Sequence, residues 1–209
     1  MSYTKDDWKK RIYERIDLSG SLVHLTKDSD DENYMDILLK ILVEKELIGS
    51  STESGYICGD RKAVCFFDAP LYSICQTTYY EQKLWKEGGE IGKRRYLGFG
   101  LAFTKDYMFS KGARPVIYEK KAVAKRFLPR DEWWRIVGFD LSDENNYIDW
   151  THEREWRIPE NFKFELSEAT LLCMNNSIVR IIAEEYENRT GDKLLSLLRG
   201  VVTLKDVFY

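Results

Sequence analysis

Strand-like and helix-like apolar patterns are mixed along this chain without the regular alternation of a βαβ repeat. Helical periodicity predicts helices at residues 4–17, 34–48, 77–87 and from about 177 onward. The expected strands cover residues 21–27, 62–70, 96–104, 114–120, 133–141 and 148–158, and a further strand at 162–166 is left open. This mixture favours an α+β fold over a doubly wound parallel sheet.

Length and composition favour one globular domain. The chain has 209 residues, of which 44% are hydrophobic, so it can bury a sizeable core. No apolar run approaches the roughly 18 residues of a membrane span, because Lys40 interrupts even "DILLKILV". The first residues also lack the apolar core of a signal peptide. A soluble, cytoplasmic protein is therefore expected.

The charge balance limits where a nucleic acid could bind. The net charge is −3, so any such site would have to be a local patch. Two short basic stretches, "GKRRY" at 92–96 and "KKAVAKRF" at 120–127, could supply one. Solvated loops and helix faces are the alternative interpretation of both.

Four cysteines are spread along the chain without any CxxC pair, at Cys58, Cys65, Cys75 and Cys173. Only two histidines accompany them, so the usual ligand spacing of a zinc site is missing. The cysteines occur in apolar stretches such as "AVCFF". We therefore expect unpaired thiols that act as small core residues.

The stretch "DWTHEREWRIP", residues 149–159, combines paired charges with tryptophans. If it is a strand, Glu153 and Glu155 point to the same face, because residues two apart share a side of the pleat. Trp150 and Trp156 flank the carboxylates and could exclude water from them. The combination predicts a functional site.

Two interpretations of this carboxylate pair stay open. Glu153 and Glu155 could serve a reaction that develops positive charge, such as cleavage of a glycosidic bond through an oxocarbenium-like state. Alternatively, they could form a cross-strand ion-pair ladder with Arg154 and Arg157. His152 is interpreted as a structural or rim residue.

The segment "SLVHLTK" places a second candidate group on an early strand. His24 shares a face with Leu22 and Thr26, so the Thr26 hydroxyl lies on the same side as the imidazole. Either a hydrogen-bonded core histidine or part of a polar pocket fits this pattern.

Four segments occur in a fixed order, and together they carry a resemblance: "VHLTK", "AVCFFDAPL", "GLAFTKDYMFSKGARPVIYEK" and "EREWRIP". The series resembles the AbiGi-type abortive-infection proteins and, more distantly, the DarT group of ADP-ribosyltransferases. It covers about residues 20–160, and a helical C-terminal part at about 177–200 follows it.

The resemblance implies one ADP-ribosyltransferase-like domain over residues 1–209, with a split mixed sheet, flanking helices and NAD in the cleft between its halves. By that resemblance, His24 with Thr26 would bind the nicotinamide side of NAD. Glu155 would hold the ribose 2′-hydroxyl, and Glu153 would complete an ExE arrangement.

Two further points follow from the resemblance. Either Phe103 or Tyr118 would stack on nicotinamide, and NAD would be consumed as a substrate. The expected function is NAD-dependent transfer of ADP-ribose to a nucleic acid or protein acceptor, in phage defence or a toxin–antitoxin system. The segment "FFDAPLYS" lacks the arginine that DarT proteins carry there. A catalytically inactive binding or antitoxin module that engages a partner through the same cleft is therefore the alternative.

Overall fold

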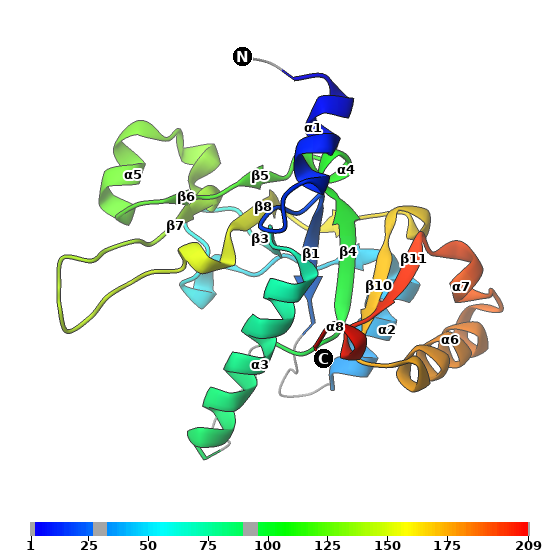
Figure 1. The fold of residues 1–209 in the computed structure, drawn as a ribbon. Coiled ribbons are helices and arrows are strands. Elements are labelled where there is room, and N and C mark those ends of the chain that lie inside the picture. Colours follow the sequence, from blue (N-terminus) through cyan, green and yellow to red (C-terminus); the bar gives the residue numbers. More distant parts are fainter. Residues whose placement is uncertain (1–2, 27–32, 90–95, 209) are drawn as a thin grey trace. The chain divides into compact units, whose positions relative to one another are not determined.

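The computed structural model describes residues 3–26, 33–89 and 96–208 (Figure 1). Most of the stretch "DSDDEN" at 28–33, whose residues are typical of a turn, and most of the basic stretch at 92–96 lie outside these residues. The chain separates into two compact units, whose relative positions are not determined, so each is described by itself. Unit 1 comprises Met1–Glu46, Ala69–Thr104 and Phe164–Tyr209, and unit 2 comprises Leu47–Asp68 and Lys105–Lys163.

Unit 1 is built on four strands in the order β11-β10-β4-β1 (Figure 1). β10 pairs with β11 in parallel and with β4 antiparallel, and β4 pairs antiparallel with β1. The bounds are β1 (Ser21–Leu25), β4 (Gly100–Thr104), β10 (Thr170–Cys173) and β11 (Gly200–Thr203). The mixed sheet and its flanking helices confirm the predicted α+β class.

A close approach between backbones fixes the pairing of β1 with β4. A Cβ atom at Gly100 would overlap the carbonyl oxygen of His24, so only glycine fits there. A glycine inside a strand often marks such a close approach, and Gly100 of "YLGFGLAFT" is an example.

The helices of unit 1 differ in the elements that they pack against. α2 packs against α6, which also contacts β10, whereas α3 contacts chiefly the short α8. Asn33 caps α2 by accepting from the backbone N–H groups of Met35 and Asp36. The bounds are α1 (Lys5–Tyr13), α2 (Tyr34–Glu44), α3 (Leu71–Glu87), α6 (Asn176–Thr190), α7 (Leu194–Leu197) and α8 (Lys205–Phe208), with a 3₁₀ turn η4 (Leu166–Glu168).

Unit 2 is built on three antiparallel strands in the order β3-β8-β5. These are β3 (Ala63–Phe67), β8 (Glu155–Pro159) and β5 (Arg114–Pro115). Two shorter pairs are β6 (Ile117–Tyr118) with β7 (Ile136–Val137), and β2 (Glu46–Leu47) with β9 (Phe162–Lys163). Its helical segments are α4 (Lys105–Ser110), α5 (Lys121–Phe127), η1 (Thr52–Ser54), η2 (Arg130–Arg135) and η3 (Thr151–Glu153).

Several helices and strands differ in the structure from the bounds that the sequence predicted, and two strands were not predicted. β10 and β11 were missed, because each is a four-residue strand without a turn signal on both sides. α3 begins at Leu71 rather than at 77, since the buried positions Ile74, Cys75 and Thr78 extend its apolar face toward Pro70. The strand expected at 133–141 is only β7, because Trp133 and Trp134 belong to the 3₁₀ turn η2.

None of the four cysteines, all of which the structure describes, forms a disulfide; Cys58, Cys75 and Cys173 are buried, and Cys65 is partly buried. Among the residues that the structure describes, every helix is too short or too polar to cross a membrane.

Candidate functional site

A short turn sets the start of β8. The Asp149 carboxylate accepts from the backbone N–H and the hydroxyl of Thr151, at 2.8 and 2.7 Å, and this starts the 3₁₀ turn η3. Arg154 ends the turn with a φ of 48°, a left-handed conformation that non-glycine residues adopt at some cost. The strand begins at the next residue, Glu155.

This turn corrects the predicted arrangement of the two carboxylates. Glu153 ends η3, whereas Glu155 opens β8, so they do not share one face of a strand as their spacing suggested. The pleat relation requires an extended chain from 153 to 155, and the left-handed Arg154 interrupts it. Glu153 is half buried and Glu155 is buried.

Glu155 forms a buried ion pair with the residue two positions along its own strand. The Nε atom of Arg157 donates to Oε1 at 2.7 Å, and a terminal nitrogen donates to Oε2 at 3.2 Å. The two side chains are only 7% and 4% exposed. Such a bidentate pair holds the carboxylate in one orientation.

The remaining donors of Arg157 bind three backbone carbonyls. One terminal nitrogen donates to the carbonyls of Trp134 and Ile136, at 2.8 and 3.3 Å, and the other donates to that of Tyr56 at 3.4 Å. Arg157 therefore ties β8 to η2, to β7 and to the loop that contains Tyr56. The second interpretation drawn from the sequence, a cross-strand ladder with Arg154 and Arg157, is met only in part, because the Glu155–Arg157 pair lies within one strand.

Tyr118 and Cys65 complete the surroundings of Glu155. The Tyr118 hydroxyl accepts from the backbone N–H of Glu155 at 2.8 Å. Burial raises the pKa of Tyr118 to about 12, and the charges of Glu155 and Glu153 act in the same direction. Burial also raises the pKa of Cys65, and Glu155 raises it further, so this thiol stays protonated near neutral pH.

A second cluster lies on the opposite face of the same strand, because neighbouring residues of a strand point to opposite sides. The indole N–H of Trp156 donates to Asp68 at 3.0 Å, and Lys105 forms an ion pair with Asp68 at 2.7 Å. The Lys105 ammonium also lies 5.9 Å from the centre of the Trp156 ring. Sequence reasoning missed Asp68 and Lys105, although both stand in segments that carry the resemblance.

The other predicted site residues belong to unit 1. His24 lies in the middle of β1, half buried and opposite Leu101. The Thr26 hydroxyl is buried and donates to the carbonyl of Phe99 at 3.2 Å. Phe103 is 1% exposed and packs edge-on against Phe164, so of the two aromatic candidates Tyr118 retains more exposed surface.

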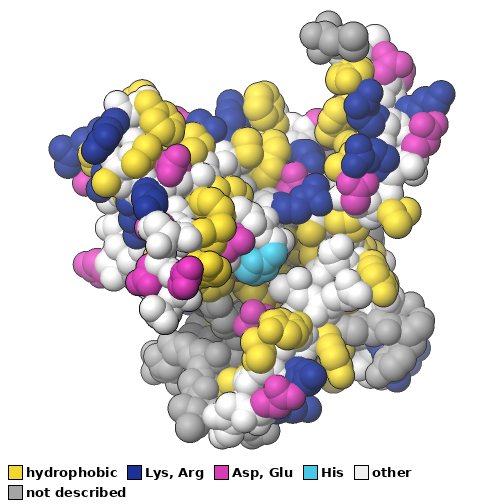
Figure 2. Space-filling model, turned by 60° about the vertical axis from the view of Figure 1, so that its left-hand side comes forward, with side chains coloured by type: hydrophobic (Ala, Val, Ile, Leu, Met, Phe, Trp, Pro, Cys, Tyr) yellow, Lys and Arg dark blue, Asp and Glu magenta, His cyan; other side chains and the backbone are white. Residues whose placement is uncertain are grey.

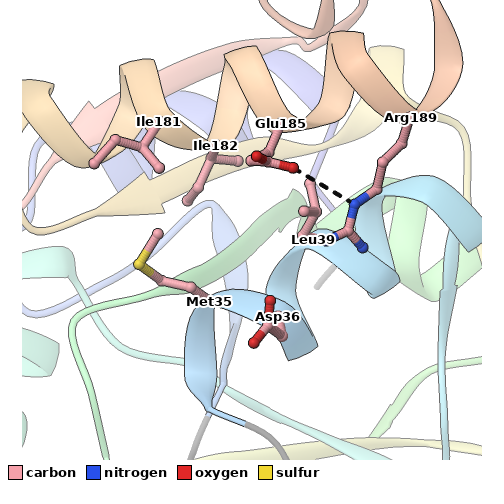
Figure 3. A pocket seen from close by; sticks show the side chains of 7 residues that line it. All are labelled: Met35, Asp36, Leu39, Ile181, Ile182, Glu185 and Arg189. Carbon is pink, nitrogen blue, oxygen red and sulfur yellow. Dashed lines mark ion pairs between the residues drawn. The ribbon is translucent and has the colours of Figure 1, made fainter.

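The hollow drawn in Figure 3 lies away from these residues, between α2 and α6 of unit 1. It has a volume of about 270 Å³ and is lined by apolar side chains from both helices and by the Glu185–Arg189 ion pair, 3.8 Å. The lining residues are Met35, Asp36 and Leu39 from α2, and Ile181, Ile182, Glu185 and Arg189 from α6. None of the predicted site residues contributes to it.

The described residues include no group of metal ligands, and comparison with known proteins assigns no role to the site. Within residues 3–26, 33–89 and 96–208, no group of three or more His, Cys, Asp or Glu side chains could hold a metal ion. No family model matches the chain, and comparison with curated proteins and with solved structures gives no match.

Proposed function

We propose that the chain is an NAD-dependent ADP-ribosyltransferase, with an ADP-ribosyltransferase-like fold, that modifies a nucleic acid or protein acceptor in phage defence or a toxin–antitoxin system. The observation that supports this best is Glu155, a desolvated carboxylate fixed at the start of a central strand of unit 2. A carboxylate stabilises a developing oxocarbenium ion most when water is excluded and its orientation is preset.

In this proposal the glycosidic bond between ribose and nicotinamide breaks, and nicotinamide leaves with the bonding electrons. Glu155 lies near the ribose and stabilises the positive charge that develops on the ring. The acceptor then forms the new bond to the same carbon and loses its proton to Glu153. His24, with Thr26, would hold NAD, and Tyr118 would stack on nicotinamide in preference to Phe103.

The acceptor class stays open between nucleic acid and protein. On the face drawn in Figure 2, Lys and Arg side chains are interspersed with Asp, Glu and hydrophobic side chains. A continuous basic surface would favour a nucleic acid. The mixed surface on this face favours neither class.

A second candidate function is a binding or antitoxin module without catalysis. It is favoured by the commitment of both Glu155 oxygens to Arg157, because the neighbouring positive charge offsets the field that Glu155 could apply to an oxocarbenium ion. The Thr26 hydroxyl is likewise already used by Phe99. In this alternative the motif residues maintain a fold that recognises a partner.

Release of nicotinamide from NAD separates the two functions. The proposal predicts turnover by the wild type, loss of NAD cleavage and transfer in Glu155→Gln, and slow cleavage without transfer in Glu153→Gln. Glu184→Gln, at an exposed position of α6, is the matched control and should turn over NAD like the wild type. Thermal unfolding of each variant tests whether it is folded.

Two results would contradict the enzymatic proposal. One is a folded wild type that releases no nicotinamide with protein, DNA or RNA acceptors present. The other is wild-type turnover in both Glu153→Gln and Glu155→Gln. Either result would favour the binding module.

A further inference from the structure

One face of α3 exposes aromatic side chains along most of the helix. Tyr72, Tyr79 and Tyr80 are 60%, 63% and 57% exposed, and Leu84 is 43% exposed. At 100° per residue they fall on one side of the helix together with Gln76, Lys83 and Glu87, all of them exposed. We call these seven residues the tyrosine face of α3.

The opposite side of α3 already packs into unit 1. Ile74, Cys75 and Thr78 are at most 2% exposed and provide the contact that holds the helix in place. The tyrosine face is therefore not needed for the packing of α3. Single exposed apolar residues are normal, but three tyrosines and a leucine on one helix face are typical of an interaction surface.

We propose that the tyrosine face of α3 binds the same face of a second copy of this chain, with the two helices antiparallel. Such an interface has a two-fold axis, so each residue must tolerate its counterpart in the second copy. With the axis near Tyr79 and Tyr80, the tyrosines of one copy pack against those of the other. Lys83 then lies near Gln76 of the second copy, and Glu87 lies near the hydroxyl of Tyr72.

The charges on α3 favour a second copy of the chain as the partner, and they favour the antiparallel direction of the two helices. In a parallel pair Lys83 would face Lys83 and Glu87 would face Glu87, and like charges in register repel. The antiparallel pair avoids both contacts and leaves the 3.7 Å Lys83–Glu87 ion pair within each copy intact. α3 carries two lysines and two glutamates, so its net charge is zero, which disfavours a nucleic acid or an anionic lipid surface.

The size of the tyrosine face predicts a weak dimer. A fully covered aromatic side chain buries 150–250 Å², so three tyrosines that are about 60% exposed can each bury roughly 100–150 Å². With Leu84 and the alkyl parts of Gln76 and Lys83, each copy would bury roughly 500–600 Å². The total of about 1,000–1,200 Å² lies at the low end of specific interfaces and fits a micromolar Kd.

Sedimentation velocity of the full chain from about 1 to 200 µM tests the dimer, because that range includes the expected Kd. Tyr79→Gln with Tyr80→Gln should weaken dimerisation at least about tenfold. Tyr147→Gln, at a 61% exposed tyrosine of unit 2, is the matched control and should leave it unchanged. Far-ultraviolet circular dichroism and thermal unfolding of each variant test whether the helix is retained. A wild type that stays monomeric throughout, or a folded double variant that dimerises like the wild type, would overturn the proposal.

Oxidative cross-linking tests the direction of the helices. Positions 72 and 87 are about 22 Å apart along one helix at 1.5 Å per residue, but they meet across an antiparallel pair. A mixture of Tyr72→Cys and Glu87→Cys chains should therefore give a mixed disulfide dimer, and neither variant should cross-link alone. Efficient cross-linking of either variant with itself would contradict the antiparallel pair.

Discussion

Unit 1 and unit 2 bury different kinds of polar side chain. Among the described residues, the buried polar side chains of unit 1 are the hydroxyls of Thr26 and Thr78, whereas those of unit 2 are the charged groups of Glu155 and Arg157. An uncharged hydroxyl that loses its partner is a modest penalty, but an unpaired buried charge is a large one. The interior of unit 2 therefore depends on one specific pair, and that of unit 1 depends mainly on apolar packing.

The largest effect is expected from removing one member of this pair. Arg157→Ala leaves the Glu155 carboxylate and three backbone carbonyls without their donors, and should lower the free energy of unfolding by about 3–5 kcal/mol. Urea unfolding followed by tryptophan fluorescence would report it, since four of the six tryptophans belong to unit 2, namely Trp133, Trp134, Trp150 and Trp156.

The matched control for this variant is Arg130→Ala. The Arg130–Asp60 pair has a similar distance, 2.7 Å, but its side chains are 71% and 64% exposed. Exposed pairs contribute little because solvent screens them, so the control should leave the free energy of unfolding close to that of the wild type. If Arg157→Ala lowers the free energy of unfolding by less than about 1 kcal/mol, unit 2 does not depend on the Glu155–Arg157 ion pair.

A smaller effect, with a pH signature, is expected at Tyr118. Tyr118→Phe removes the acceptor of the Glu155 backbone N–H and should lower the unfolding free energy by about 1–2 kcal/mol at neutral pH. The pKa of Tyr118 rises to about 12 in the folded chain, so the folded state binds the phenolic proton more tightly than the unfolded state does. This contribution to stability is complete below about pH 10 and is lost between about pH 10 and 12.

Urea unfolding at a series of pH values from about 9 to 12 checks this dependence. The wild type should lose more stability across the upper part of the range than Tyr118→Phe does, because the variant lacks the titrating phenol. Burial raises the pKa of Cys75 to about 11 and that of Cys173 to about 12, so these thiols titrate there too, but they are present in both proteins. If the free energy of unfolding falls with pH in the same way in both proteins, Tyr118 does not have a raised pKa in the folded chain.

The smallest effect is expected in unit 1. Thr26→Val keeps the shape and the β-branched character of the side chain, and it removes one donor to the Phe99 carbonyl. That carbonyl still accepts from the backbone N–H of residue 26 at 2.8 Å. The loss of unfolding free energy should be about 1 kcal/mol or less. A loss of 3 kcal/mol or more, on the order of that expected for Arg157→Ala, would remove the contrast between the two units.

Periodicity predicted the parts of the fold in which one repeat persists over several residues. β1, β3 and α2 lie close to their expected places, because α2 has a persistent apolar face and β1 and β3 are apolar runs that bury residues on both sides of the strand. β10 and β11 were missed because four residues give no measurable alternation, and their pairing is decided by contacts distant in sequence. The strand expected at 148–158 was shortened by a local hydrogen bond, since the Asp149 side chain favours a turn over extension.

The candidate site was predicted by residue type but not by geometry. The charges of "EREWRIP" drew attention to Glu155, which the structure buries, and the spacing of Glu155 and Arg157 allowed a pair on one face. What the sequence did not reveal is the burial of that pair, which depends on the carbonyls of Tyr56, Trp134 and Ile136. The cluster of Asp68, Lys105 and Trp156 was missed for the same reason, because its members come from three separate segments.

A crystal structure of the protein grown with NAD is the measurement that tests the proposed function most directly. The proposal predicts that the ribose next to nicotinamide lies beside Glu155, with His24 on its other side and the His24 and Glu155 side chains within about 15 Å of each other. Nucleotide bound elsewhere, or His24 and Glu155 separated by clearly more than this distance, would contradict a shared NAD site.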